Sequence, residues 1–238
     1  MNSYMSSSNL KSSAREQLLG HYGSVIGGIF LIFLIKLSLF LLALSMVNLE
    51  SIAGTLLYYT VSILISVISG ILSAGFCFMF LKLTCNQPVL ASDVFYAFQN
   101  NSGKAALLAL FFTLMSDLIS LPFTIISDFF MNHQDPIWLL ISCLCLVLCG
   151  AATILFYLIF SQVYYLMLDF PEYSVKQLLQ SSTQIMKGNK GRLFYLCVSF
   201  IPLFLLSILS LGIALLWVLP YVRCALTNFY LDTMRNRS

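Results

Sequence analysis

The chain has 238 residues, of which 60% are apolar and 9% are charged, and its formal net charge is +3. An average soluble domain has about 45–50% apolar and about 25% charged residues. A soluble fold of this length could not bury so much apolar surface, so the composition predicts an integral membrane protein. Nucleic-acid binding is not indicated, because the basic residues flank apolar segments, where anionic headgroups attract them.

Six apolar segments follow one another along the chain: 25–47, 52–81, 105–126, 137–167, 193–209 and 213–231. A helix needs about 20 apolar residues to cross the hydrocarbon layer. We therefore expect an all-α membrane protein with six transmembrane helices arranged as three hairpins. The first segment begins after some two dozen mostly polar residues and has no small-residue cleavage site, so we interpret it as a retained span and not as a signal peptide.

The distribution of basic residues predicts the orientation of these spans. Ten of the twelve Lys and Arg residues lie in the two tails and in two of the loops, namely Lys11, Arg15, Lys82, Lys104, Lys176, Lys187, Lys190, Arg192, Arg235 and Arg237. The alternate gaps 48–51, 127–136 and 210–212 contain none. Because cytoplasmic loops carry the Lys and Arg excess, we expect both termini in the cytoplasm. A single span over 193–219 is an alternative, but it would place three arginines outside.

A short amphipathic helix is expected in the cytoplasm before each hairpin, over 8–19, 92–100 and 174–187. The third shows the clearest signals, since Ser174 and Gln177 have capping-box spacing and Gly188 is a typical stop. Each helix is followed by a four-residue breaker, at 20–23, 100–103 and 188–191. Within one polytopic domain, 1–238, we infer repeat units 8–82, 91–168 and 174–231. The alternative is that any polytopic protein needs helix stops before its spans.

Small residues recur every fourth position in the second span, at Ser62, Ser66, Gly70 and Ala74. Such a row permits close helix approach, and we expect it to pack against the first span. Prolines interrupt the third, fifth and sixth spans, where we expect simple kinks. They are Pro122, Pro202 and Pro220.

Signatures of enzymes are absent: there is no Gly-rich phosphate loop, no Gly-x-Ser-x-Gly elbow and no His-Glu-x-x-His helix. The two histidines, His21 and His133, fall on opposite sides of the expected membrane. None of the seven cysteines lies in a gap that we expect outside the membrane. This excludes a disulfide framework on the outer side of the membrane. We expect no catalytic residue, no metal and no cofactor.

Three charges lie inside the expected spans: Lys36, Asp117 and Arg223. A charge in mid-membrane costs about 2.5–3.5 kcal/mol on insertion scales, so it normally faces the protein interior and has a partner. Lys36 lies 13 residues beyond Gly23 and Asp117 lies 14 beyond Gly103, which predicts similar depths. We therefore expect a Lys36–Asp117 ion pair between the first and third spans, with Arg223 as the rival partner for Asp117.

The C-terminal third resembles a known family. The resemblance rests on the runs 186–191, 216–221 and 228–232, and its motif residues are Gly188, Gly191, Trp217, Pro220, Tyr221, Phe229 and Tyr230. The stretches 10–18 and 93–98 are also similar to that family, the bacterial integral membrane proteins grouped as domain of unknown function 975. The resemblance implies a protein of the bacterial cytoplasmic membrane. It carries over no established activity and no catalytic residues.

We expect a non-enzymatic envelope protein that assists transport or lipid handling through its surface helices. The main alternative is a small secondary transporter with a polar site at Lys36, Asp117 and Arg223, and a membrane-embedded enzyme ranks below both. The expected partners are the lipid bilayer and a membrane protein, and nucleic acid is not among them.

Overall fold

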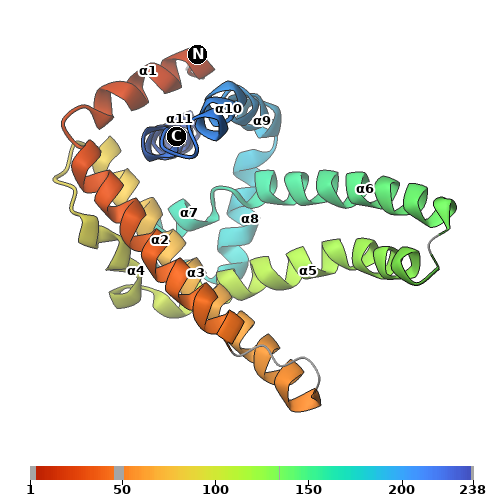
Figure 1. Ribbon diagram of the computed structural model, residues 1–238. Helices are drawn as coiled ribbons and strands as arrows, with labels where there is room; N and C mark the ends of the chain where they lie inside the picture. The colour runs from red at the N-terminus through yellow and green to blue at the C-terminus, as the bar shows by residue number, and fades with distance from the viewer. Residues whose placement is uncertain (1–3, 46–50, 134, 237–238) are drawn as a thin grey trace.

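The computed structural model describes residues 4–45, 51–133 and 135–236, and every regular element in these ranges is helical. Two long hairpins dominate the structure. The first joins α2 (Tyr22–Ser45) to α3 (Ile52–Thr84), and the second joins α5 (Ser102–His133) to α6 (Pro136–Phe160). Figure 1 shows the two hairpins diverging from a common base. Most of the first outer turn lies outside the described residues, as does Arg237.

The C-terminal part of the chain forms a third group of helices: α9 (Lys190–Val198), α10 (Ile201–Leu209) and α11 (Leu215–Arg235). The expected tight turn lies between α10 and α11. There Leu211 and Gly212 both adopt the left-handed conformation, with φ of 52° and 88°. The Gly212 N–H donates to the Ser207 carbonyl at 2.8 Å, which closes the turn.

Five helical segments in the described ranges are long and apolar enough to cross a membrane. They are Tyr22–Ser45, Gly54–Thr84, Ser102–Met131, Pro136–Asp169 and Lys190–Leu209. The expectation of an all-helical membrane protein is therefore confirmed at this level. The sixth expected span corresponds to α11, which is not among the five and carries buried polar residues along its second half.

The short helices expected before each hairpin are present. They are α1 (Ser7–Leu18), the pair formed by η1 (Ala91–Phe95) and α4 (Tyr96–Gln99), and α8 (Val175–Met186). The capping box of Ser174 and Gln177 forms as predicted. Left-handed residues follow the three helices, with φ of 82° at Gly20, 62° at Asn101 and 86° at Gly188. The helix breakers thus end the three short helices at the expected places. The division of the chain into three repeat units stays a prediction.

Helix α3 lies at the centre of the packing, and glycines allow its close contacts. A Cβ on Gly75 would lie 1.9 Å from the Val94 carbonyl oxygen of η1. A Cβ on Gly70 would lie 2.1 Å from the Cβ of Ala109 in α5. Gly70 belongs to the small-residue row that we expected to pack on the first span. At this position the row instead packs on the third, so the expectation was wrong there.

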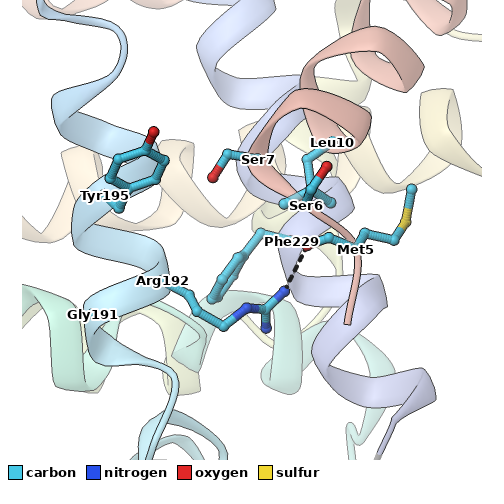
Figure 2. A pocket seen from close by; sticks show the side chains of 8 residues that line it. All are labelled: Met5, Ser6, Ser7, Leu10, Gly191, Arg192, Tyr195 and Phe229. Atoms are coloured by element: carbon cyan, nitrogen blue, oxygen red, sulfur yellow. Dashed lines mark hydrogen bonds between the residues drawn. The ribbon is translucent and has the colours of Figure 1, made fainter. Parts of the chain in front are cut away.

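The two ends of the described chain are tied together (Figure 1). The buried carboxylate of Asp232 in α11 accepts the Met5 N–H at 3.1 Å and pairs with Arg192 at 2.7 Å. Arg192 also donates to the Met5 carbonyl at 3.1 Å. Figure 2 shows this bond among the side chains that line a small hollow, which include Phe229 and Tyr195. The hollow has a volume of about 350 Å³. We call this arrangement the terminal clamp.

Helix α1 continues from the clamp along α11. Its apolar face, formed by Leu10, Ala14 and Leu18, is buried. The side-chain oxygen of Gln17 accepts from the Asn228 amide at 2.9 Å. Lys11 lies beside this face and donates to the Ser199 carbonyl at 3.0 Å, and partial burial together with the charge of Arg15 lowers the pKa of Lys11. This helix is therefore packed onto the protein along one whole face.

Candidate functional site

A large cavity lies between the two hairpins and the C-terminal helices. Its volume is about 990 Å³, and residues of α2, α3, α5, α6, α9 and α11 line it, together with the segment from Ser161 to Tyr165. Apolar side chains form most of the wall, and Phe30, Phe33 and Leu216 are among those that are exposed. The cavity therefore lies within the predicted membrane-spanning part of the molecule.

Two of the three predicted intramembrane charges line this cavity. They are Lys36 of α2 and Arg223 of α11, and we call the space the cationic cavity. The Arg223 guanidinium lies 5.4 Å from the ring centre of Phe76 in α3. Neither an aspartate nor a glutamate is among the described residues that line it. Two cations, both on exposed residues, thus share one partly open space without a carboxylate among the described residues of its wall.

Asp117 is not part of this wall. It lies four residues beyond Thr113, which does line the cavity, and so it falls on the same side of α5 about 6 Å further along the helix. Its side chain is exposed, and among the residues that the structure describes it has no ion pair with Lys36 or Arg223. The expected Lys36–Asp117 pair is therefore not formed here, because the two hairpins diverge.

The helical segment Pro136–Asp169 is interrupted at the cavity. α6 ends at Phe160, α7 begins at Val163 and ends at Asp169, and Ser161 and Gln162 lie between them. Irregular backbone at membrane depth is tolerated only where it is buried in protein or lines a cavity. Here both intervening residues line the cationic cavity. We expected kinks at prolines, yet this break occurs where the chain has none.

Hydroxyl groups add polarity to the wall. They belong to Ser66, Ser69, Ser73, Thr113, Tyr157, Ser161, Tyr164 and Tyr165. Three of the serines come from α3, where they face the cavity at intervals of three or four residues. The cavity is thus a largely apolar space with a band of hydroxyl groups and two positive charges.

Tyr165 also holds the helix turn that carries Arg223. Thr227 donates its hydroxyl hydrogen to the Arg223 carbonyl at 3.0 Å. The Tyr165 hydroxyl, 3.0 Å from the Thr227 oxygen, must therefore be the donor in that contact. The buried Tyr165 ring also stacks on Tyr230, with ring centres 5.0 Å apart. These contacts fix α11 against α7 at the level of Arg223.

None of the seven family-motif residues is among the described residues that line this cavity. Gly188 and Gly191 lie before and within the first turn of α9, Pro220 and Phe229 are buried in α11, and Trp217 is exposed. Two aromatic residues make specific contacts: the Tyr221 ring packs edge-on against Phe200, and the Tyr230 hydroxyl donates to Asp169 at 2.5 Å. Their contacts hold α11 in place.

The sequence identified the two cations but not Gln162 or the hydroxyl band. Ser161 and Gln162 did give a signal, because two adjacent polar residues interrupt an otherwise apolar run. The seven cysteines are all free, and no cluster of three or more His, Cys, Asp or Glu within the described ranges could hold a metal ion. The polar chemistry of the site therefore comes from cations, hydroxyls and one amide.

Comparison with known proteins gives one match. No curated protein and no solved structure matches the chain. The family model described as Protein of unknown function (DUF975) matches residues 1–237, which is nearly the whole sequence. The resemblance seen in the motif residues is thereby confirmed, and the chain belongs to the DUF975 family.

Proposed function

We propose that this protein is a non-enzymatic membrane protein that binds an anionic lipid in the cationic cavity and so takes part in lipid handling. The observation that carries the proposal is the position of Lys36 and Arg223 on one cavity wall that has no carboxylate. A cation inside a spanning segment is costly unless a counter-charge accompanies it. The phosphate of a lipid would supply that counter-charge.

The dimensions and the wall of the cavity also suit a lipid. Its volume of about 990 Å³ is at the upper end of the range for small-molecule sites, about 300–1,000 Å³. Apolar side chains that reach both the cavity and the outer surface, such as Phe30, Phe33 and Leu216, would let acyl chains lie partly in the protein and partly in the bilayer.

The expected setting is the cytoplasmic membrane of a bacterium, with both termini in the cytoplasm and α11 as a sixth span. In support, Lys82, Lys104 and Lys190 lie at the helix ends that meet the amphipathic helices. The bilayer is the main partner, and the exposed apolar side chains of the α5–α6 hairpin would also suit a membrane protein. Nucleic acid has no place in this proposal.

A second candidate is a small secondary transporter for a water-soluble anion. The break between α6 and α7 favours it, because transporter sites often lie at interrupted helices. Such a site would use Lys36 and Arg223, with Asp117 one helix turn beyond the wall. A free anion and a lipid phosphate share the same chemistry, so the experiment must separate them.

The test is lipid binding to the purified full chain in neutral detergent, measured by native mass spectrometry. We expect phosphatidylglycerol to bind more tightly than phosphatidylcholine with the same acyl chains. Lys36→Gln and Arg223→Gln should each weaken binding of the anionic lipid roughly tenfold, as expected for loss of one charge-assisted hydrogen bond. Lys176→Gln, which removes an exposed charge on α8, is the matched control and should leave binding unchanged.

The outcomes distinguish the candidates. Equal binding of the two lipids, or insensitivity to both cavity variants, would contradict the lipid proposal. Displacement of bound lipid by millimolar inorganic phosphate, with uptake of phosphate into vesicles that contain the protein, would favour the transporter instead.

A further inference from the structure

Two opposite charges in the predicted spanning part of the chain have no ion-pair partner among the described residues. They are Lys36 of α2 and Asp117 of α5, and both are exposed. The helix segments around them are not buried either: within the described ranges, α2 has no buried residue beyond Gly28, and α5 has none beyond Ala109. A charge that faces hydrocarbon is costly, so a charge within a span normally has a partner.

Both charges lie at the outer end of the cationic cavity. Lys36 is the last residue of α2 that lines the cavity, and Thr113 is the last of α5. Asp117 follows Thr113 by one turn, about 6 Å further along α5. The hairpins touch where Gly70 of α3 packs on Ala109 of α5, and they diverge beyond that contact (Figure 1). Within one copy the divergence keeps the two charges apart, although they lie at nearly the same level.

A two-fold rotation exchanges the directions of the two hairpins. If the axis bisects the angle between them, the α2–α3 hairpin of one copy runs parallel to the α5–α6 hairpin of the other, with the bases of both on the same side. Copies in one membrane share one orientation, so such an axis lies along the membrane normal. It can bring Lys36 of each copy next to Asp117 of the other. The divergence that separates the pair within one copy therefore allows it between two.

Charge complementarity favours a second copy over another kind of partner. Each copy offers an unpaired acid on α5 and a cation on α2, so the surface is complementary to itself, and a closed dimer pairs all four charges at once. A different protein would need both charges at matching levels. The surroundings of the charges suit helix packing, since Phe40 and Leu121, each one turn beyond its charge, are exposed. A lipid phosphate on Lys36 would leave Asp117 without a counter-charge.

We propose that two copies of this chain form a dimer in the membrane, in which Asp117 in α5 of each copy pairs with Lys36 in α2 of the other. The dimer is independent of the lipid proposal, because it rests on the unpaired Asp117 and on the divergence of the hairpins. The two proposals share one cation, so the partner's carboxylate and a lipid phosphate would compete for Lys36. The dimer is therefore tested in neutral detergent without added lipid.

Charge reversal in two differently tagged, co-expressed copies tests the pairing. Lys36→Asp and Asp117→Lys should each lower the affinity of the dimer roughly a hundredfold when expressed alone, because like charges then face each other at both contacts. Mixed, the two variants should associate as wild type does, since both contacts again join opposite charges. Co-purification and native mass spectrometry measure the dimer. Lys176→Asp, which reverses an exposed charge on α8, is the matched control and should dimerise normally.

Cysteine cross-linking in native membranes tests the same contact with the charges intact. In cysteine-free copies with different tags, Phe40→Cys in one and Leu121→Cys in the other should form a disulfide between copies on oxidation with copper phenanthroline. Leu209→Cys, at an exposed position of α10, replaces Phe40→Cys as the control and should give no cross-link.

Absence of the cross-link would overturn the dimer even if the charge variants fold poorly. Mixed charge variants that associate no better than either variant alone would exclude the ion pair between copies. Neither result bears on the lipid proposal, which is decided by the binding of phosphatidylglycerol.

Discussion

Asp232 lies where three distant parts of the chain meet. Its side chain is 3% exposed, whereas that of its partner Arg192 is 27% exposed. The carboxylate also accepts the Met5 N–H, and the Arg192 guanidinium lies 4.1 Å from the ring centre of Tyr4. Removal of one member of such a pair leaves a buried charge without compensation, which costs more than the pair itself contributes.

Arg192→Gln should therefore lower the free energy of unfolding by about 2 kcal/mol, less than the 3–5 kcal/mol of a fully buried pair because Arg192 is partly exposed. Thermal unfolding in detergent measures the loss, and Lys187→Gln, a neighbouring exposed charge, is the control. Adding Asp232→Asn to Arg192→Gln should recover part of the stability, because no buried charge then remains. A double variant no more stable than Arg192→Gln alone would contradict this account.

Among the side chains of the candidate site, the sequence predicted the charged ones and missed the neutral ones. Lys36 and Arg223 stood out because a charge inside an apolar run has few explanations. Gln162 did not, because its burial beside the cavity follows only from the tertiary packing around it. The Lys36–Asp117 pair was inferred from depth alone, and depth does not determine which way a helix leans.

Helix–helix contacts in this protein depend on a few glycines. A Cβ on Gly75 would meet the backbone of η1 at Val94, which cannot move aside like a flexible side chain. Glycine inside a helix otherwise costs about 1 kcal/mol relative to alanine. Close packing at this contact therefore outweighs the intrinsic preference for alanine.

Gly75→Ala should lower the melting temperature of the protein, because the new methyl group would separate α3 from η1. Gly150→Ala is the matched control: it lies within α6, a Cβ added there would meet no neighbouring atom within 4 Å, and the change should be neutral or slightly stabilising. Both variants are compared by thermal unfolding in the same detergent. An equal shift for the two would show that this contact is not tight in the membrane-embedded protein.

The short helices were the most predictable elements. Their caps and stops are local, so Ser174, Gln177, Gly20 and Gly188 could be assigned from spacing alone. The last long helix was less predictable. Its apolar residues suggested an ordinary span, whereas its second half buries Asn228 and Asp232 against partners from the N-terminal segment and α9.

For the whole molecule, orientation in the membrane is the prediction most open to a direct test. Apart from Lys36 and Arg223, the basic residues of the described ranges fall in the short helices or near the helix ends that adjoin them, and the turn between α10 and α11 contains none. If both termini are cytoplasmic, that turn faces outward.

In a cysteine-free background, a single cysteine at Ile213 should react with an impermeant thiol reagent on intact cells, and one at Gln180 should not. Ile213 is exposed at the turn, and Gln180 lies on the exposed face of α8. Lysed cells are the control, in which both positions should react. Labelling of Gln180 but not of Ile213 on intact cells would reverse the orientation, and equal protection of both would contradict α11 as a sixth span.

Helical class, family and the approximate bounds of five candidate spans were accessible from the sequence, since they follow from local composition and motif residues. The arrangement of the spans was not. The row of small residues in α3 could have packed against any neighbouring helix. Its contact with Ala109 of α5 depends on the tertiary packing of all the hairpins. The cavity arises from that arrangement, which explains why its full wall could not be foreseen.

The terminal clamp has a consequence for biosynthesis. Met5 bonds to Asp232, a separation of 227 residues, so α1 leaves the ribosome long before α11. Until α11 follows, the apolar face of Leu10, Ala14 and Leu18 lacks the helix that packs most extensively against α1, and an incompletely covered amphipathic helix favours the membrane interface. Docking of α1 onto α11 is therefore expected to be a late step of assembly.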